Sequence, residues 1–390
     1  MTVVEASQGP ARWKAEWAEL YSEVVTSGLC TGCAACVIAC PHDVLGYDAG
    51  GTYRPFHLEE ELGPGGCGHG LRGCTSCTRA CPRFRQWETE ADSYLFGRPR
   101  LPTEQSGVAS RAMLARAADP ELVERGQDGG VVSAILIWCL EQDRIDAALV
   151  CLLEGDGSGW RAVPGVARTR AEVLACAGSR YTYSANTLAY AQAVAGGAER
   201  IALVGMGCQA SAPVVMKARK AGKVGRRLAL SIGLMCSKTF DDAIFEEFFE
   251  ARYGIPRKEI ARINIKGAFQ IWCRDGSYHE LPLKEGHAWT REGCKSCPDF
   301  AAEHADISTG GIGEYSDWTL TVVRSEQGQE IVEEMASAGA LQVRPGEDDP
   351  AALSLMNRLS SASRRRWPLT ASPEPRSGVP MPNSARAALA

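Results

Sequence analysis

The chain has 390 residues, 45% hydrophobic and 23% charged, which is enough for two or three domains with buried cores. Its net charge of −5 at pH 7 gives no electrostatic reason to expect a nucleic-acid partner. Because no apolar run is long enough to span a bilayer and no leader-like stretch opens the chain, we expect a cytoplasmic protein without a membrane span.

Cysteine is used heavily, with sixteen copies in the chain. In a reducing compartment this number favours metal ligation over disulfides. Cys139 and Cys151 are different, because they lie in apolar segments. We expect these two to be small buried hydrophobic residues.

The first predicted element is an amphipathic lead helix within residues 1–25. Trp13, Trp17, Leu20 and Tyr21 recur there at helical spacing. We expect this stripe to pack against the domain that follows.

The next segment, residues 26–100, contains the spacing Cys30-x2-Cys33-x2-Cys36-x3-Cys40-Pro41. This is the pattern of bacterial ferredoxins that hold two clusters. Structural zinc is the alternative, but zinc sites pair two CxxC turns across a longer stretch and give no role to the Cys-Pro ending. The pattern predicts a ferredoxin-like domain with two [4Fe-4S] clusters.

A second, altered copy, CTSCTRACP, follows at residues 74–82. Leu71 occupies its expected first cysteine position, and Cys67 in a glycine-rich loop is the candidate replacement. His69 of the same loop is expected to lie near the cluster without binding it. In two-cluster ferredoxins the last cysteine of each run crosses to the other cluster. The predicted ligand sets are therefore Cys30, Cys33, Cys36 and Cys81 for one cluster, and Cys40, Cys67, Cys74 and Cys77 for the other.

Residues 86–110 have prolines and mixed polar residues, and they predict a surface linker. Over residues 110–325, apolar runs alternate with helix-like segments, which predicts an α/β domain with a mostly parallel sheet. The expected buried strands are Ala147–Leu153, Arg200–Val204 and Leu228–Leu234.

The remaining chain divides into two predicted parts. Residues 326–363 are expected to form a C-terminal helical segment. Residues 364–390 are rich in Pro, Ser, Ala and Arg, so we expect a disordered tail. The Arg364-Arg365-Arg366 run at its start is interpreted as a solvated charge run, with a partner contact as the alternative.

Four further cysteines stand at the ends of predicted elements. Cys208 and Cys236 each follow a predicted strand, and Cys294 and Cys297 form a CxxC pair. Ligands of open α/β sheets gather beyond the carboxyl ends of the strands, so convergence of the four would build a third cluster site there. The spacing alone leaves a zinc site or a redox-active dithiol open.

Six ordered segments give the chain a resemblance to a known family. Over roughly residues 26–325 it resembles the family of coenzyme F420 hydrogenase/dehydrogenase beta subunits. The segments are GQDGGVVSAIL (126–136), AGSRYTYS (177–184), VGMGCQ (204–209), GLMCSKTF (233–240), INIKG (263–267) and GCKSCPDFAAEHADISTGGIG (293–313).

The resemblance implies an FAD- and cluster-binding catalytic domain, and it assigns Cys208, Cys236, Cys294 and Cys297 to a third cluster. The chain departs from the family at Gly207, where members commonly carry proline. This change alters backbone stiffness beside a ligand but removes no sulfur. Hydrogen bonds that shape the nearby cluster loop are expected from Asp299, Asp306 and Ser308.

The flavin site is expected to be built by three of these segments. Gly126, Gly129 and Gly130 precede an apolar run that predicts a helix, so their loop would offer backbone N–H groups to the FAD pyrophosphate; an ordinary turn is the alternative. Lys266 is a candidate contact for phosphate or reduced flavin, with a surface lysine as the alternative. By resemblance, the pocket for flavin or deazaflavin is further lined by Ser179, Arg180 and Tyr181.

The resemblance therefore implies an iron-sulfur flavoprotein oxidoreductase. Coenzyme F420, a deazaflavin, would be the co-substrate that exchanges hydride with FAD, and two or three [4Fe-4S] clusters would pass single electrons to or from a partner. That partner would be a hydrogenase, dehydrogenase or reductase subunit, or a ferredoxin. No side-chain nucleophile or acid-base pair is required for this exchange.

The alternative is a ferredoxin-dependent reductase of an organic substrate, like the chlorophyll-pathway reductases of the same family. Such an enzyme needs a proton donor beside the flavin. The candidates for that role are Tyr181, Tyr183 and His287.

Overall fold

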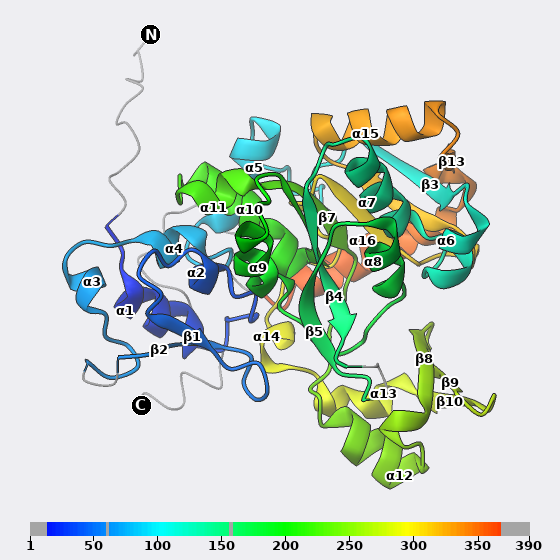
Figure 1. Ribbon diagram of the computed structural model, residues 1–390, viewed down its shortest axis with the longest axis horizontal. Coiled ribbons are helices and arrows are strands. Elements are labelled where there is room, and N and C mark those ends of the chain that lie inside the picture. Colours follow the sequence, from blue (N-terminus) through cyan, green and yellow to red (C-terminus); the bar gives the residue numbers. More distant parts are fainter. Residues whose placement is uncertain (1–13, 60–61, 156–158, 368–390) are drawn as a thin grey trace.

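The computed structural model describes residues 14–59, 62–155 and 159–367. They form an N-terminal cluster domain and a larger domain built on an eight-stranded sheet (Figure 1). No helix of these residues is long and apolar enough to cross a membrane.

The cluster domain consists of short elements joined by loops. Its lead helix is confirmed: Trp17 and Leu20 are buried with the cysteines of this domain, whereas Trp13 lies outside the described residues. A two-stranded antiparallel sheet covers the loops. The elements are α1 (Trp17–Leu20), a π-helical turn (Tyr21–Val25), α2 (Ala35–Ile38), β1 (Leu45–Tyr47), β2 (Pro55–His57), α3 (Gly68–Leu71) and α4 (Ser76–Ala80).

The predicted linker is wrong for its first half, which forms helix α5 (Trp87–Phe96). Trp87 and Ala91 stand four residues apart and therefore share one face of this helix. Both are buried against Val214 and Val215 of the larger domain. Helix α5 thus joins the two domains, while the prolines that predicted a linker follow it.

The large sheet has the strand order β13-β3-β12-β11-β7-β6-β4-β5. The three strand predictions are confirmed by β4, β6 and β7, and Cys139 is fully buried as expected, although Cys151 on β4 is only half-buried. The strands are β3 (Arg111–Ala117), β4 (Ala147–Leu153), β5 (Ala162–Ala167), β6 (Ile201–Met206), β7 (Leu228–Leu234), β11 (Ile307–Gly310), β12 (Thr319–Val323) and β13 (Leu341–Pro345).

The prediction of a mostly parallel sheet is wrong, because the sheet is mixed. Its central strands β4, β6, β7 and β11 pair in parallel. The flanking pairs are antiparallel. Residues 154–161 connect β4 to β5 and residues 311–318 connect β11 to β12, and both segments are too short for the crossover that a parallel pair needs.

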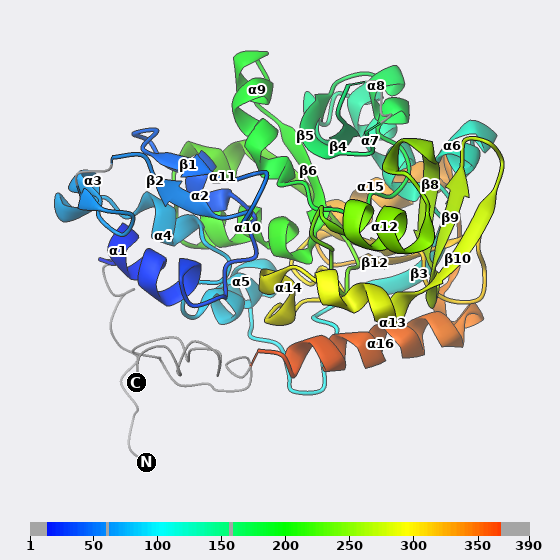
Figure 2. The same cartoon turned by 90° about the horizontal axis from the view of Figure 1, so that it is seen from below.

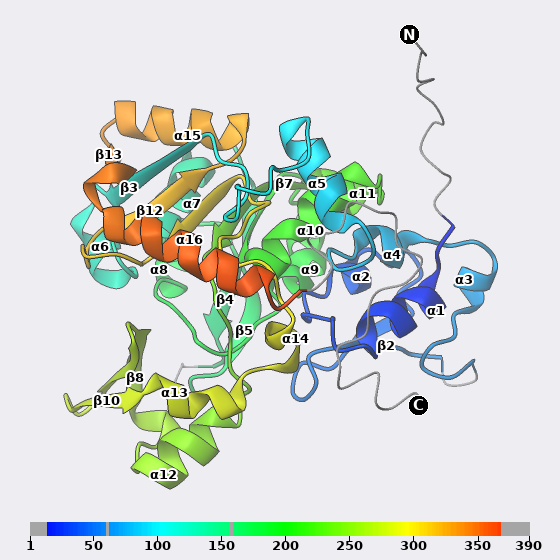
Figure 3. The same cartoon turned by 180° about the vertical axis from the view of Figure 1, so that it is seen from behind.

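Helices cover both faces of this sheet. One face packs against α7 and α15, and the other against α9, α10 and α16. Figure 3 shows α16 in front of β3 and β12. The helices of this domain are α6 (Pro120–Arg125), α7 (Val131–Glu141), α8 (Arg170–Ala175), α9 (Tyr190–Ala195), α10 (Gly207–Ala218), α11 (Lys223–Arg227), α14 (Glu292–Lys295), α15 (Glu326–Ser337) and α16 (Pro350–Arg364), with 3-10 turns at Asn186–Ala189 and Gly346–Asp348.

An additional lobe, absent from the sequence predictions, lies beyond β5 (Figure 1). It is an antiparallel sheet of the order β10-β9-β8, packed on helical turns through a cluster of phenylalanines. Its elements are a π-helical turn (Ile244–Glu250), α12 (Ala251–Tyr253), a 3-10 turn (Arg257–Glu259), β8 (Ile260–Ile265), β9 (Ala268–Cys273), β10 (Tyr278–Pro282), α13 (Leu283–Gly286) and a 3-10 turn (His287–Trp289).

The C-terminal predictions need correction. The segment 326–363 is not helical throughout, since β13 lies within it and pairs with β3. The arginine run is not simply solvated, because Arg364 forms a salt bridge with Glu88 and Arg366 donates to the Ser237 carbonyl; only Arg365 is exposed. Helix α16 ends beside the cluster domain (Figure 2). The predicted disorder falls on residues 368–390, which lie outside the described residues.

Candidate functional site

The first predicted ligand set is brought together at the base of the cluster domain. Cys30, Cys33 and Cys36 lie in and before α2, and Cys81 follows α4. Burial foremost, and then the neighbouring thiolates of Cys81 and Cys30, raise the pKa of Cys33 to about 12. Gly32 allows the tight loop, because its φ is +80° and a Cβ there would stand 2.5 Å from the Tyr53 carbonyl oxygen.

The second set surrounds a hollow at the outer end of the domain. Burial raises the pKa of Cys77 to about 12, with the thiolates of Cys74, Cys40 and Cys67 acting in the same direction. Cys67 caps α3 and accepts the Gly70 backbone N–H at 3.4 Å. The hollow, about 300 Å³ including space open to solvent, is lined by all four cysteines.

Leu71 and His69, the two other residues considered near Cys67, are not placed like cluster ligands. Leu71, at the position where the pattern expects cysteine, is 74% exposed. The His69 ring stacks on His42 with centroids 3.6 Å apart, and Arg72 contacts the Nδ1 atom of His69 at 3.0 Å. Both imidazoles line the mouth of the hollow and are engaged by other side chains.

The third set lies in the larger domain. Cys208 opens α10 directly after β6, Cys236 follows β7, and Cys294 and Cys297 lie in and after α14. All four line a hollow of about 320 Å³, again including open space. Burial raises the pKa of Cys208, and the thiolate of Cys297 acts in the same direction. The predicted convergence at the carboxyl ends of parallel strands is what the structure shows.

Several donors point at the sulfurs of the third set. The Thr239 backbone N–H donates to Cys294 Sγ at 3.4 Å, and Arg83 donates to Cys297 Sγ at 3.5 Å. A Cβ at Gly207 would stand 2.3 Å from Asp299 Oδ2, so the buried Asp299 carboxylate occupies the space that a side chain at this position would need. Hydrogen bonds of this kind tune the ligands of a metal centre.

Asp306 and Ser308 act away from the sulfurs. Asp306 accepts the Ser231 backbone N–H at 2.7 Å and so joins β7 to the start of β11. Ser308 donates to the Ala302 carbonyl at 2.8 Å. Both side chains support the backbone that follows the CxxC pair, and their expected role in shaping the cluster loop stays a prediction.

The cysteine sets fit clusters better than single ions. No three His, Cys, Asp or Glu side chains in the described ranges are gathered so that they could hold one metal ion. A [4Fe-4S] cube binds each of its four thiolates through a different iron, so its ligands surround a larger space. The two hollows, each ringed by four cysteines, have this character.

The three sets follow one another through the molecule. Cys208 of the third set lies close enough to Cys33 of the first for their charges to interact, and the same holds for Cys36 of the first and Cys77 of the second. Thr187 of the larger domain donates to the Cys33 carbonyl at 2.5 Å. The order is therefore third, first, second, from the sheet toward the outer end of the cluster domain.

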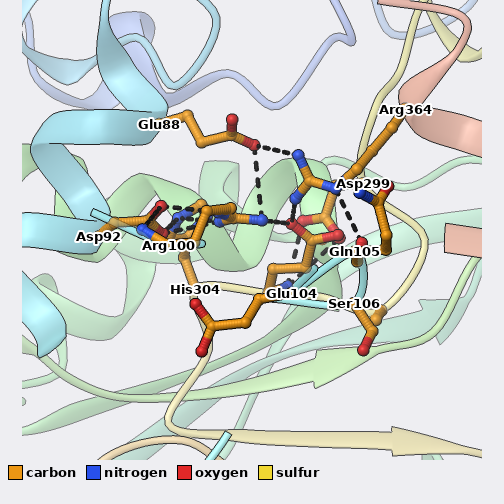
Figure 4. A network of polar contacts seen from close by, with 12 residues as sticks. Glu88, Asp92, Arg100, Glu104, Gln105, Ser106, Asp299, His304 and Arg364 are labelled. Atoms are coloured by element: carbon orange, nitrogen blue, oxygen red, sulfur yellow. Dashed lines mark hydrogen bonds and ion pairs between the residues drawn. The ribbon is translucent and has the colours of Figure 1, made fainter. Parts of the chain in front are cut away.

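A buried network of charges adjoins the third set (Figure 4). Arg100, which follows α5, pairs with Asp92 at 2.6 Å and with Glu303. Arg364 of α16 also pairs with Glu303, whose backbone N–H donates to Asp299 at 3.3 Å. The network therefore ties α5 and α16 to the segment that follows Cys297.

The glycine-rich loop and Lys266 are in contact with each other. Gly130 caps α7 with φ +68°, and a Cβ at Gly129 would stand 2.9 Å from the Asp317 carbonyl oxygen, so the loop requires glycine there. Lys266 Nζ forms an ion pair with Asp128 Oδ1 at 2.9 Å. Lys266 is exposed but paired, and its partner Asp128 lies within the motif GQDGG.

The third segment that was predicted to bind flavin lies close to Asp128. Tyr181 donates to Asn264 Oδ1 at 3.1 Å, and burial foremost raises the pKa of Tyr181 to about 12. The Arg180 guanidinium stands over Trp160 at 5.4 Å, and its Nε atom is buried without a partner, as is Gln127 Nε2. A buried donor without a partner requires an acceptor, and a bound flavin nucleotide would supply one.

The other proposed proton donors lie elsewhere. Tyr183 is buried under Arg291, 3.6 Å from the ring centroid, and lines the hollow of the third cysteine set. His287 is exposed; partial desolvation foremost, and then the charges of Lys238 and Arg366, lower its pKa. Of the three candidates, Tyr181 alone makes a described contact within the flavin motifs.

Comparison with known proteins decides the family. The model of the coenzyme F420 hydrogenase/dehydrogenase beta subunit matches in two parts, its N-terminal part at residues 112–190 and its C-terminal part at 198–349. The beta subunit of coenzyme F420 hydrogenase from Methanothermobacter thermautotrophicus is 31% identical over 286 residues, which are 71% of this chain and 99% of that protein. The chain belongs to the family of coenzyme F420 hydrogenase/dehydrogenase beta subunits.

Other relatives match a larger share of this chain. One subunit of the F420H2 dehydrogenase from Methanosarcina mazei is 24% identical and matches 88% of this chain and 92% of that protein. The coenzyme F420-dependent sulfite reductase of Methanocaldococcus jannaschii is 31% identical and matches 80% of this chain and 46% of that protein. A 4Fe-4S binding domain model matches residues 23–45.

A solved structure supports the same assignment. A chain of the F420-reducing [NiFe] hydrogenase complex from Methanosarcina barkeri superposes with a TM-score of 0.64 and 27% identity, over 68% of this chain and 92% of that chain. This family member is an oxidoreductase of the F420-linked type, with a 4Fe-4S electron-transfer domain at its N-terminal side.

Proposed function

We propose that this chain exchanges hydride between coenzyme F420 and FAD and passes single electrons through three [4Fe-4S] clusters to or from a partner protein. The observation that carries the proposal is the succession of three four-cysteine sets that begins in the same domain as the flavin motifs. When bound, FAD supplies the conversion between two-electron and one-electron transfer.

The residues of the flavin motifs have distinct roles in this proposal. The loop from Gly126 to Gly130 places backbone N–H groups at the start of α7, where a pyrophosphate would bind. Lys266 supplies the positive charge that favours phosphate or reduced flavin, and Asp128 holds this lysine in place. Tyr181 and Arg180 line the pocket, with Tyr181 fixed by Asn264.

The names of the relatives support F420 as the hydride partner. The three relatives are named for a hydrogenase, a dehydrogenase and a sulfite reductase, and what they share in name is F420. We infer that the partner differs among family members while the deazaflavin step is common. A hydrogenase, dehydrogenase or reductase subunit, or a ferredoxin, would receive or supply the electrons here.

Turnover of reduced F420 tests the proposal directly. Anaerobically reconstituted protein is mixed with reduced F420 and a viologen dye, and the absorbance of oxidised F420 is followed. We expect rapid dye reduction by the parent protein and its loss in Cys236→Ala, whose flavin should still be reduced by F420. The matched control is Cys273→Ala, a buried cysteine of the additional lobe, which should keep dye reduction.

Other results point elsewhere. Absence of flavin and cluster absorbance in the purified protein would contradict the proposal. A fully loaded protein that does not oxidise reduced F420 would favour the ferredoxin-driven reductase instead.

A further inference from the structure

Arg83 is a buried cation at the junction of the two domains. It follows Cys81 and Pro82, and only 1% of its surface is exposed. Its guanidinium stacks on Trp87 of α5 at 4.4 Å and donates to the Pro82 carbonyl at 2.5 Å. These contacts fix the orientation of a side chain whose charge is expensive to bury.

The anions that offset this charge are cysteine thiolates. Arg83 Nη2 donates to Cys297 Sγ at 3.5 Å, and the Cys208 thiolate and the Asp299 carboxylate lie near enough to attract the same guanidinium. Arg83 therefore reaches from the cluster domain into the wall of the third cysteine set, on a segment far from it in sequence.

The same guanidinium also acts on the first set. Its charge is felt by the thiols of Cys30, Cys33 and Cys81. Arg83 thus lies between the first and third sets, where an electron passing between the domains would cross.

We propose that Arg83 is a positioning residue that raises the reduction potential of the third cluster. A positive charge and an N–H···S hydrogen bond both stabilise the reduced cluster, which carries the extra negative charge. Through this effect the third cluster accepts electrons from the flavin side more readily than an uncompensated buried cluster would. The inference rests on the third cluster of the proposed function.

The test is a redox titration of Arg83→Gln, followed by electron paramagnetic resonance. The signal of the third cluster is identified as the one missing from Cys236→Ala. We expect this signal in Arg83→Gln to titrate at a lower potential than in the parent protein. Arg83→Lys, which keeps the charge but not the planar fork, should show a smaller shift of the same sign.

Arg85→Gln is the matched control. Arg85 lies two residues further along the same segment and pairs with Glu23 at 2.6 Å, not with a cysteine. Its signal should titrate like that of the parent protein. An unchanged potential in Arg83→Gln overturns the proposal. Should this variant lose the third cluster, Arg83→Met is titrated in its place, and an unchanged potential in that variant overturns the proposal equally.

The outcome separates this inference from the proposed function. Iron and sulfide analysis of the parent protein reports whether a third cluster exists, independently of Arg83. A parent protein with fewer clusters contradicts the proposed function, whereas a loaded variant without a potential shift contradicts only the role of Arg83.

Discussion

Single residues decide which sulfurs can act as ligands. Cys67 lies four residues before the position where the pattern expects a cysteine and is close to Cys77, whereas Leu71 at the expected position is exposed. His69, two residues away, is stacked on His42 instead. Side-chain direction, which spacing does not reveal, separates these residues.

Removal of Cys67 is therefore expected to cost one cluster. Cys67→Ala should lower the iron and sulfide content by one cube and remove one cluster signal from the resonance spectrum. His69→Ala, in the same loop, should keep the full iron content. Equal iron content in the two variants would exclude Cys67 as a ligand.

Lys266 is expected to control flavin affinity. Lys266→Met removes the ammonium that pairs with Asp128, and a charged hydrogen bond contributes about 1.5–3 kcal/mol. We expect FAD to bind at least about tenfold more weakly, as measured by flavin fluorescence on dilution. Lys284→Met, an exposed lysine of α13, serves as the control and should bind FAD like the parent protein. Unaltered FAD binding in Lys266→Met would remove this lysine from the site.

At the scale of elements, the sequence predicted those features that depend on residues close together in the chain. The strands β4, β6 and β7 were predicted because each is a continuous apolar run between helical segments. Spacing predicted the first two cysteine sets, whereas for the third set spacing left a zinc site or a dithiol open and the family resemblance indicated a cluster. Contacts between distant segments were not: Lys266 and Asp128 are 138 residues apart, and Tyr181 and Asn264 are 83 apart.

The mixed character of the sheet could have been predicted from loop length. The connections after β4 and β11 are too short for parallel crossovers. Helix α5 was not predicted from the sequence, because the prolines and polar residues that follow it indicated a linker more strongly than its short apolar stripe indicated a helix. Its burial depends on α10, which follows more than a hundred residues later.

Helix α5 is held by the buried charge network, so its central arginine should matter for stability. Arg100→Met removes the cation shared by Asp92, Glu88 and Glu303, although Arg364 still pairs with Glu88 and Glu303. Removal of one partner from a buried ion pair costs about 3–5 kcal/mol, which is the upper bound here. We expect a clear drop in the midpoint of thermal unfolding, followed by circular dichroism. Arg98→Met breaks only exposed contacts, with Glu104 and with the Pro99 carbonyl, and should leave the midpoint unchanged. Equal midpoints for the two variants would show that the network contributes no net stability.

At the scale of the whole molecule, the two ends of the described chain meet. Helix α16 runs along the sheet toward the cluster domain (Figure 2). Trp367, which follows this helix, belongs to the apolar core of the cluster domain together with Trp17, Leu20 and Phe84. Besides the packing of α2 and α4 on α9 and α10, the larger domain holds the cluster domain through α5 and through the end of α16. Fixed domain positions keep the first and third cysteine sets adjacent.

The attachment through the end of α16 predicts the effect of Trp367→Ala. Removing a buried tryptophan costs about 3–5 kcal/mol, and here the loss falls on the core that surrounds the first and second cysteine sets. On gentle heating, the variant should lose iron from the cluster domain before it releases flavin, whereas the parent protein should lose both together. Tyr315→Ala, at a residue 42% exposed, is the control and should behave like the parent protein. Parallel loss of iron and flavin in Trp367→Ala would show that the contacts of Trp367 are not needed to hold the cluster domain in place.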